Sequence, residues 1–244
     1  MKSKLLSSLV LLGFSGAAAA AVDCNSFANN TVTGFVNDDV IAIGYTCIVG
    51  RNGYINGNLT QLDDGSVVVR GTINGNITES GRGSVTVNRG TVSGDTYESD
   101  SGGIVVRSGG SINGSLDEAG GGNVTVSVEM GGILNSSVVE ADSGSVSVTT
   151  VSGNFEGSVD ESGGGSIVIA VDPGTSFKGS VREAAVGDVI VEVDGSFEGN
   201  LTELGGGVLT TSGTGIFKGN SEHGLPGQCS NSIASFEGAP CNLL

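Results

Sequence analysis

A short phrase repeated about ten times along this chain restricts the folds that it can adopt. Each copy reads as an apolar residue, any residue, Gly, a small polar residue, an apolar residue, any residue and then usually Glu. Successive copies start roughly 20 residues apart, and a fixed period in this range is typical of a solenoid, because each repeat can bury its apolar face only against its neighbours. The copies begin at Val32, Ile55, Ile73, Val92, Ile112, Leu134, Phe155, Phe177, Phe197 and Phe217.

Within each repeat the apolar residues alternate, which predicts β-strands rather than helices. In the copy that begins at Ile73, apolar side chains fall on even offsets, and Val85 and Val87 resume the alternation after a Gly-rich break. A period of two points one face of each strand inward. We therefore predict an all-β fold, a single parallel β-helix (β-solenoid) of roughly ten coils of about 18–23 residues with disulfide-stapled ends.

The first position of the phrase is aliphatic up to Leu134 and becomes a run of phenylalanines from Phe155 onward. Stacked strands bring equivalent residues within about 4.8 Å, so like side chains pack on one another. We interpret this column as a structural ladder rather than a cofactor site, because the phenylalanines continue an aliphatic column. Glycine at the third position leaves room where the coil narrows or bends. Ser136 is the one residue that breaks the glycine column.

The N-terminal segment has the features of an export signal. Lys2 and Lys4 precede an apolar stretch at 5–14 and an alanine run that ends in an A-x-A pattern at Ala21. This pattern predicts a Sec-type signal peptide whose apolar core is too short to span a membrane. We expect a secreted, extracellular or cell-surface protein without an integral membrane span. The predicted organisation is a signal peptide at 1–21, an N-terminal cap and first coil at 22–54, regular repeats at 55–220 and a C-terminal cap at 221–244.

The composition is strongly acidic. The chain has 26 Asp and Glu against 10 Lys and Arg, and removal of Lys2 and Lys4 leaves 8 basic residues, so that 8 − 26 gives a net charge near −18. Such a surface repels nucleic acid and anionic lipid, and it favours solubility or cation binding. We therefore predict no nucleic-acid partner.

Four cysteines in an exported chain predict two disulfides. Cys24 and Cys47 precede the regular repeats, whereas Cys229 and Cys241 follow them. Roughly nine turns at about 4.8 Å each separate the two ends by some 40 Å. Since a disulfide needs Cα atoms within about 7 Å, we predict the pairs Cys24 with Cys47 and Cys229 with Cys241.

The most unusual column of the repeat is acidic and lies at offset six. Like charges stacked at about 4.8 Å repel by very roughly 1 kcal/mol per pair in water. The column therefore needs exposure, raised pKa values or bound cations. Two interpretations stay open: a row of Ca²⁺ or other cation sites on glycine turns, and a solvated corner that keeps the solenoid soluble. The column carries Asp38, Glu79, Glu98, Glu118, Glu140, Glu161, Glu183 and Glu203, with Gln61 and His223 as exceptions.

Catalysis has little support in the sequence. The loops are short, His223 is the sole histidine and the calcium-binding motif G-G-x-G-x-D is absent. No nucleophile with a nearby base can be assembled from these residues. We predict no enzymatic activity and no cofactor other than Ca²⁺ on the acidic column.

At the level of its repeated phrase, the chain resembles the bactofilin family of polymer-forming bacterial proteins. The resemblance covers most of residues 32–220 and implies a right-handed β-helix and self-association into filaments. This chain departs from the family in its export signal, its cysteines and the Glu at the seventh position. The matching units are Ile-Asn-Gly-Asn-Leu at 55–59, Ile-Asn-Gly-Asn-Ile at 73–77, Ile-Asn-Gly-Ser-Leu at 112–116 and Phe-Glu-Gly-Ser-Val at 155–159.

Three functions follow as hypotheses. The first is a structural or adhesive component of the cell surface or extracellular matrix, which associates with itself or with other surface components. The second is a cation-binding module built on the acidic column. The third is ice binding by an outward Thr/Val face. That face is predicted at Val68, Thr86, Val105, Thr125, Ser147, Val168, Ile190 and Thr210.

Overall fold

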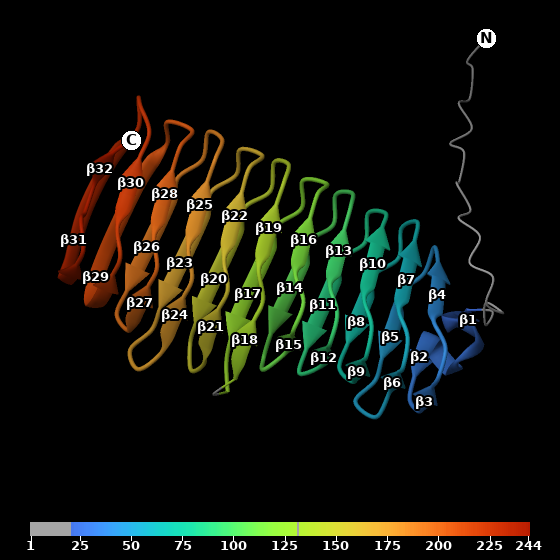
Figure 1. Cartoon of the computed structure of the whole chain (residues 1–244). Coiled ribbons are helices and arrows are strands. Elements are labelled where there is room, and N and C mark those ends of the chain that lie inside the picture. The colour runs from blue at the N-terminus through green and yellow to red at the C-terminus, as the bar shows by residue number, and fades with distance from the viewer. Residues whose placement is uncertain (1–20, 131) are drawn as a thin grey trace, which may run out of the picture.

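The chain forms a single β-solenoid. The computed structural model describes residues 21–130 and 132–244, so the predicted signal peptide lies outside the described residues except for Ala21. The described chain is all-β apart from two short 3-10 turns, η1 (Cys24–Ser26) and η2 (Ala28–Asn30), and winds through about 11 turns (Figure 1). No helix of this part of the chain is long and apolar enough to cross a membrane.

The coils have three faces, each built from parallel strands that stack from one coil to the next. The first face is a 12-stranded sheet, and each inner strand pairs with its equivalents one coil before and one coil after. Its strands are β1 (Val22–Asp23), β4 (Val40–Ile43), β7 (Leu59–Leu62), β10 (Ile77–Ser80), β13 (Thr96–Glu98), β16 (Leu116–Glu118), β19 (Val138–Glu140), β22 (Val159–Glu161), β25 (Val181–Glu183), β28 (Leu201–Glu203), β30 (Ser221–His223) and β32 (Asn242–Leu243).

The second face also pairs strand by strand along the solenoid. Its inward side chains are mostly Val, Ile and Leu, as expected for a buried strand face. Its strands are β2 (Thr31–Val32), β5 (Cys47–Val49), β8 (Val67–Val69), β11 (Val85–Asn88), β14 (Ile104–Arg107), β17 (Val124–Val128), β20 (Val146–Thr150), β23 (Ile167–Val171), β26 (Val189–Val193), β29 (Val208–Lys218) and β31 (Gln228–Glu237).

The third face holds the first position of the repeated phrase. In the N-terminal half it is a separate sheet, whereas in the C-terminal half it joins the second face, because β29 and β31 run through both faces without a break. The separate sheet contains β3 (Phe35–Val36), β6 (Tyr54–Ile55), β9 (Thr72–Ile73), β12 (Thr91–Val92) and β15 (Ser111–Ile112). The later strands are β18 (Ile133–Asn135), β21 (Asn154–Glu156), β24 (Ser176–Lys178) and β27 (Ser196–Glu198).

The pairing register corrects the predicted repeat at both ends. Val36, not Val32, pairs with Ile55, so the first copy of the phrase begins at Val36. The same register places Asp38, rather than Gly34, at the glycine position opposite Gly57. Phe236 pairs with Phe217 and adds a further copy at the C-terminal end. The copies of the phrase thus match the turns of the solenoid one for one.

The core is one continuous set of side-chain columns, and the predicted phenylalanine ladder is confirmed. Neighbouring rings from Phe155 to Phe236 stack with their centroids 4.5–4.8 Å apart. The rings from Phe155 to Phe217 are fully buried. Because the ladder continues the aliphatic column that precedes it, the solenoid has no internal boundary between two separate cores.

The glycine column is explained by a close approach between coils. A Cβ atom at Gly157 would lie 1.9 Å from the carbonyl oxygen of Ser136 in the preceding coil. At Ser136, the exception in the column, the hydroxyl donates a hydrogen bond to the carbonyl of Gly114 in the preceding coil at 2.5 Å. Glycine is therefore needed where the backbone of one coil touches the next.

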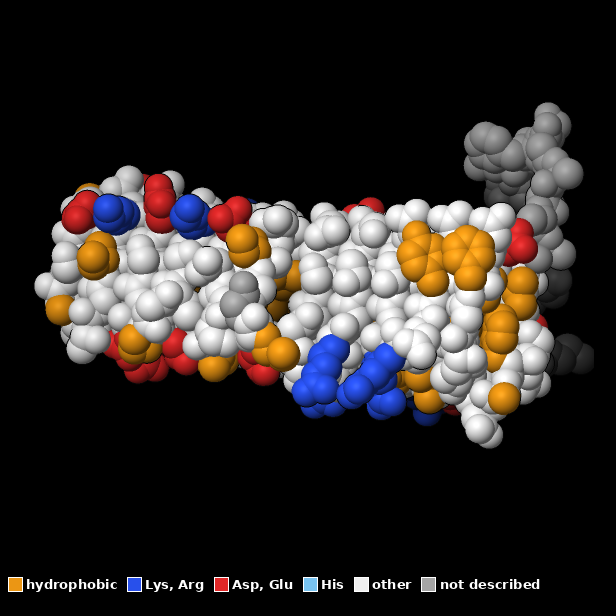
Figure 2. Space-filling view, turned by 90° about the horizontal axis from the view of Figure 1, so that it is seen from below, with side chains coloured by type: hydrophobic (Ala, Val, Ile, Leu, Met, Phe, Trp, Pro, Cys, Tyr) orange, Lys and Arg blue, Asp and Glu red, His pale blue; other side chains and the backbone are white. Residues whose placement is uncertain are grey.

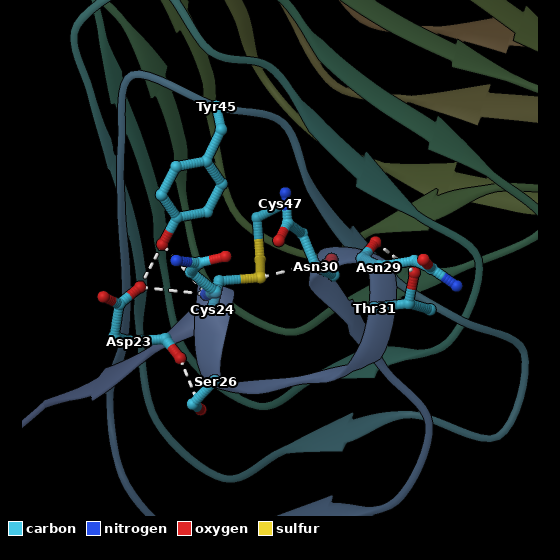
Figure 3. The surroundings of a disulfide bond; sticks show 9 residues. Asp23, Cys24, Ser26, Asn29, Asn30, Thr31, Tyr45 and Cys47 are labelled. Atoms are coloured by element: carbon cyan, nitrogen blue, oxygen red, sulfur yellow. Dashed lines mark hydrogen bonds between the residues drawn. A yellow bond between two sulfur atoms is a disulfide. The ribbon is translucent and has the colours of Figure 1, made fainter.

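Both predicted disulfides are present, one near each end. Cys24 pairs with Cys47 at a Cα–Cα distance of 6.0 Å, and Cys229 pairs with Cys241 at 5.5 Å. At the N-terminal end η1 packs against β2 and β4, and the hydroxyl of Tyr45 donates to the carboxylate of Asp23 (Figure 3). At the other end the bridge ties β31 to the residue before β32, so it links two faces of the last coil.

Candidate functional site

The acidic column predicted at offset six runs along the inside of the first face. Strand pairing aligns its members in one register, and the side chains that were candidates for metal binding are all at most 1% exposed. The interpretation as a solvated corner is therefore wrong. The aligned residues are Ala42, Gln61, Glu79, Glu98, Glu118, Glu140, Glu161, Glu183, Glu203, His223 and Leu243. Asp38 does not belong to the column, because the register places Ala42 there.

Six of these carboxylates close the turn that follows their own strand. The Oε1 atom of Glu118 accepts hydrogen bonds from the backbone amides of Gly120 and Gly122 at 2.9 and 3.0 Å. The Oε1 atom of Glu161 accepts from three consecutive amides, those of residues 163–165, at 2.8–3.0 Å. The column thus supplies buried acceptors for turn donors that would otherwise be unpaired. Glu98, Glu140, Glu183 and Glu203 also accept at least one amide of their own turn.

The spacing E-x-x-x-G is the local reason for this arrangement. A glycine follows each glutamate of the column four positions later, from Glu79 to Glu203. A Cβ atom at Gly122 would lie 1.3 Å from the carbonyl oxygen of Gly102 in the preceding coil. Only glycine therefore allows the turn to pass this close to its neighbour while its amide reaches the carboxylate.

The second oxygen of these carboxyl groups has no donor. Both carboxyl oxygens of Glu79 are buried without a hydrogen-bond partner. An ionised carboxylate only accepts hydrogen bonds, so two ionised neighbours in the column cannot satisfy each other. A proton on one of them creates an O–H donor for the next, at the cost of neutralising one charge. The Oε2 atoms in the same state belong to Glu98, Glu118, Glu140, Glu161, Glu183 and Glu203.

The pKa values of four carboxyl groups in the column are raised above the usual value for glutamate. Burial, reinforced by the neighbouring Glu118 and Glu79 carboxyls, raises the pKa of Glu98 to about 9. Burial raises the pKa of Glu140 to about 8, and the neighbouring carboxyls in the column add to the shift. Burial also raises the pKa of Glu183 to about 8 and shifts the pKa of Glu79 upward. The column is therefore partly protonated at neutral pH, so raised pKa values are the way in which this stack of carboxylates limits its repulsion.

The geometry of the column does not favour a metal centre. The Oε1 atoms are directed at backbone amides, and among residues 21–130 and 132–244 no group of three or more His, Cys, Asp and Glu side chains is arranged to hold an ion. Instead, the carboxylates accept hydrogen bonds from the backbone amides of six consecutive turns and so stabilise these turns from the inside of the solenoid. Cation binding by Glu79, Glu98, Glu118, Glu140, Glu161, Glu183 and Glu203 stays a prediction.

The predicted Thr/Val face exists as one register on the outside of the second face. Val68, Thr86 and Val105 pair in consecutive strands, and Thr125 follows. The side chains of this column are half-buried or exposed and alternate irregularly between hydroxyl and aliphatic groups. Ice binding by this surface stays a prediction. The column continues through Ser147, Val168, Ile190 and Thr210.

A basic corner of the solenoid was not predicted from the sequence. This corner consists of Arg51, Arg70, Arg89 and Arg107, which lie between the second and third faces, one in each of four successive coils. In Figure 2 one group of basic side chains lies along the lower edge of the molecule, and other basic side chains at the upper left alternate with acidic ones. An open pocket of about 320 Å³ lies here, lined by Arg51, Arg70, Asn88, Arg89 and Ser108. The available signal was an arginine at or just after the end of four successive strands of the second face, β5, β8, β11 and β14, in a chain that is acidic overall.

No protein-family model, curated protein or solved structure matches this chain. The functional assignment therefore depends on the geometry described above.

Proposed function

We propose that this protein is a non-catalytic structural or adhesive component of the cell surface or extracellular matrix. The observation that supports this best is the stack of parallel strands along the solenoid, which is unbroken over the 12 strands of the first face. Eleven coils at about 4.8 Å give a rod roughly 50 Å long. Such a rod suits a spacer or a subunit of an assembly, because each coil supports only its neighbours and the stack behaves as one body.

The exported location is part of the same proposal. The predicted signal peptide and two disulfides are compatible with an oxidising, extracellular environment. A disulfide near each end resists unravelling where a solenoid has only one neighbouring coil to support it. Both features suit a protein that must persist outside the cell.

Self-association is the route by which such rods build a matrix. β31 and β32 are the last strands of their sheets, and their outer edges pair with no further strand in the part of the chain that the structure describes. An open β-edge offers backbone donors and acceptors to another chain. The resemblance to the bactofilins also supports self-association into filaments.

The test is the assembly state of the mature protein, residues 22–244. Size-exclusion chromatography with light scattering and negative-stain imaging should show oligomers or filaments whose axis continues that of the solenoid. A monodisperse rod at all concentrations would contradict self-association and leave only a monomeric spacer.

Addition of millimolar Ca²⁺ separates the cation-binding alternative from the structural one. Assembly that requires Ca²⁺ and is lost in the double variant Glu140→Gln, Glu161→Gln would assign cation binding to the acidic column. Assembly indifferent to Ca²⁺ would reject that role, and the variant Glu192→Gln on the exposed surface controls for a change of charge.

A further inference from the structure

The basic corner differs from the other basic residues of the protein in its lack of ion pairs. After the predicted signal peptide the chain has 8 Lys and Arg residues, since 10 less Lys2 and Lys4 leaves 8. Arg51, Arg70, Arg89 and Arg107 make no ion pair with a carboxylate of the described residues. In a chain this acidic, the unpaired guanidinium groups are concentrated in one place. The other four, Arg82, Lys178, Arg182 and Lys218, form ion pairs with carboxylates at 3.2–3.9 Å.

The solenoid repeat positions these arginines in a staggered row. Arg70 and Arg107 align with Asn88, whereas Arg51 and Arg89 lie one residue further along their coils. Each follows the previous one after a single coil, so that the chain returns to the same corner each time. Successive coils are about 4.8 Å apart, so the row extends over roughly 14 Å along the solenoid axis. The first carboxylate beyond the row is Glu129, which follows β17, the neighbour of β14. The four like charges therefore lie together without a neutralising group among them.

The backbone of the corner is held by hydrogen bonds. The amide of Arg70 donates to the carbonyl of Val49 at 2.8 Å, and the amide of Gly110 donates to the carbonyl of Arg107 at 3.0 Å. Arg89 has a left-handed φ angle of 62°, which turns the chain sharply between the faces. The arginine side chains therefore extend from Cα atoms that sit on a fixed frame.

Neutral donors complete the pocket. Asn88 pairs in register with Arg107, and with Ser108 it lines the same hollow of about 320 Å³ as the arginines. An amide and a hydroxyl add short-range donors beside the guanidinium groups, which bind planar or tetrahedral oxyanions through paired N–H donors. The pocket lining includes no carboxylate and no aromatic ring.

We propose that the pocket formed by Arg51, Arg70, Asn88, Arg89 and Ser108, extended by Arg107, binds sulfate or phosphate groups, as found on an anionic glycan. A linear glycan with ester groups on successive sugar rings can lie along the row and place one group in the pocket. Nucleic acid fits less well, because the protein as a whole is strongly acidic and the lining residues offer no aromatic platform for bases. The site is separate from the acidic column and does not depend on assembly.

The experiment is isothermal titration of residues 22–244 with inorganic sulfate, with pyrophosphate, and with a short dextran sulfate. Unsulfated dextran of the same length serves as the uncharged control. We expect dextran sulfate to bind, to weaken as salt rises, and to be displaced by the inorganic anions. Binding of the inorganic anions alone would also support the site, and would assign it to free oxyanions rather than a glycan.

The double variant Arg70→Gln, Arg89→Gln should lower the affinity for dextran sulfate by tenfold or more, since each arginine supplies a charge-assisted hydrogen bond. The matched control is Arg82→Gln, Arg182→Gln, which changes the net charge equally at arginines already held in ion pairs. An equal loss of affinity in both variants would show that only the net charge matters, and would overturn the proposed site. Absence of binding, or tighter binding of a single-stranded oligonucleotide than of dextran sulfate, would overturn the proposal too.

Discussion

The buried acidic column predicts that the folded protein loses stability as the pH rises from about 4.5 to 8. The pKa values of Glu98, Glu140 and Glu183 are raised to about 9, 8 and 8 from 4.5, mainly because burial penalises the charged form. In this interval the unfolded chain has released these protons, whereas the folded chain still holds them. The free energy of unfolding therefore decreases with pH, because the folded state binds more protons.

Glu140 alone shows the size of the effect. Each pH unit between the unfolded and folded pKa values changes the free energy of unfolding by about 1.4 kcal/mol for one group. Between pH 4.5 and pH 7 this amounts to on the order of 3 kcal/mol. The stabilisation is fully present below pH 4.5 and lost as the pH rises through about 8. Hydrogen bonds hold the pKa values of Asp23 and Asp194 below their usual 3.8, so their contribution changes at lower pH, outside this interval.

The measurement is urea unfolding of residues 22–244 at several pH values from about 4 to 9, for the natural protein and for Glu140→Gln. The glutamine keeps the shape and the acceptor oxygen but does not titrate, so the variant should lose part of the pH dependence and become more stable than the natural protein near pH 8. Glu192→Gln, on the exposed outer surface, should leave the slope unchanged. Stability that is flat or rises with pH in this interval would refute the partly protonated column.

Further variants test the packing of the coils by urea unfolding. Gly144→Ala would bring a Cβ atom within 1.5 Å of the carbonyl oxygen of Gly122 and should cost more than about 3 kcal/mol. Gly34→Ala meets nothing within 4 Å and should change stability by less than about 1 kcal/mol; equal effects of the two would reject the close-approach argument. Phe177→Ala removes two ring stacks, at 4.7 and 4.8 Å, and should cost about 3–5 kcal/mol, whereas a loss below about 1 kcal/mol would mean that the ladder relaxes around the gap. Cys229→Ser opens the bridge of the last coil and should cost about 3 kcal/mol, with an unchanged unfolding midpoint as the contrary result.

The position of the acidic column could be predicted from the sequence, although its interpretation as a solvated corner was wrong. Offset six is an even offset, and the alternation that correctly placed Ile73 and Ile77 inward places Glu79 inward as well. A stack of carboxylates in an apolar interior is costly, so exposure was the simpler interpretation. The cost is reduced by turn amides and shared protons, and the glycine four positions after each glutamate was the available signal.

The ends and the corners were the hardest to predict. The first and last copies of the phrase begin at Val36 and Phe236. Because the phrase is degenerate, the sequence permits more than one alignment of these copies, and only the strand pairing between coils identifies the correct one. The arginines of the basic corner are spread over four coils of an acidic chain. They form a site because each coil brings the next one back to the same edge.

The solenoid, the columns of its core and the two disulfide pairs can all be derived from the order of the amino acids. They follow from the regular period of the repeat, from alternation along each strand, and from the distance between the ends of a stack of coils. Three properties can be determined only from the folded structure: which columns are buried with polar partners, how the second and third faces merge, and where unpaired charges lie together. Those properties depend on contacts between coils, since hydrogen bonds, desolvation and charge act between residues that are neighbours in space but a whole coil apart in sequence.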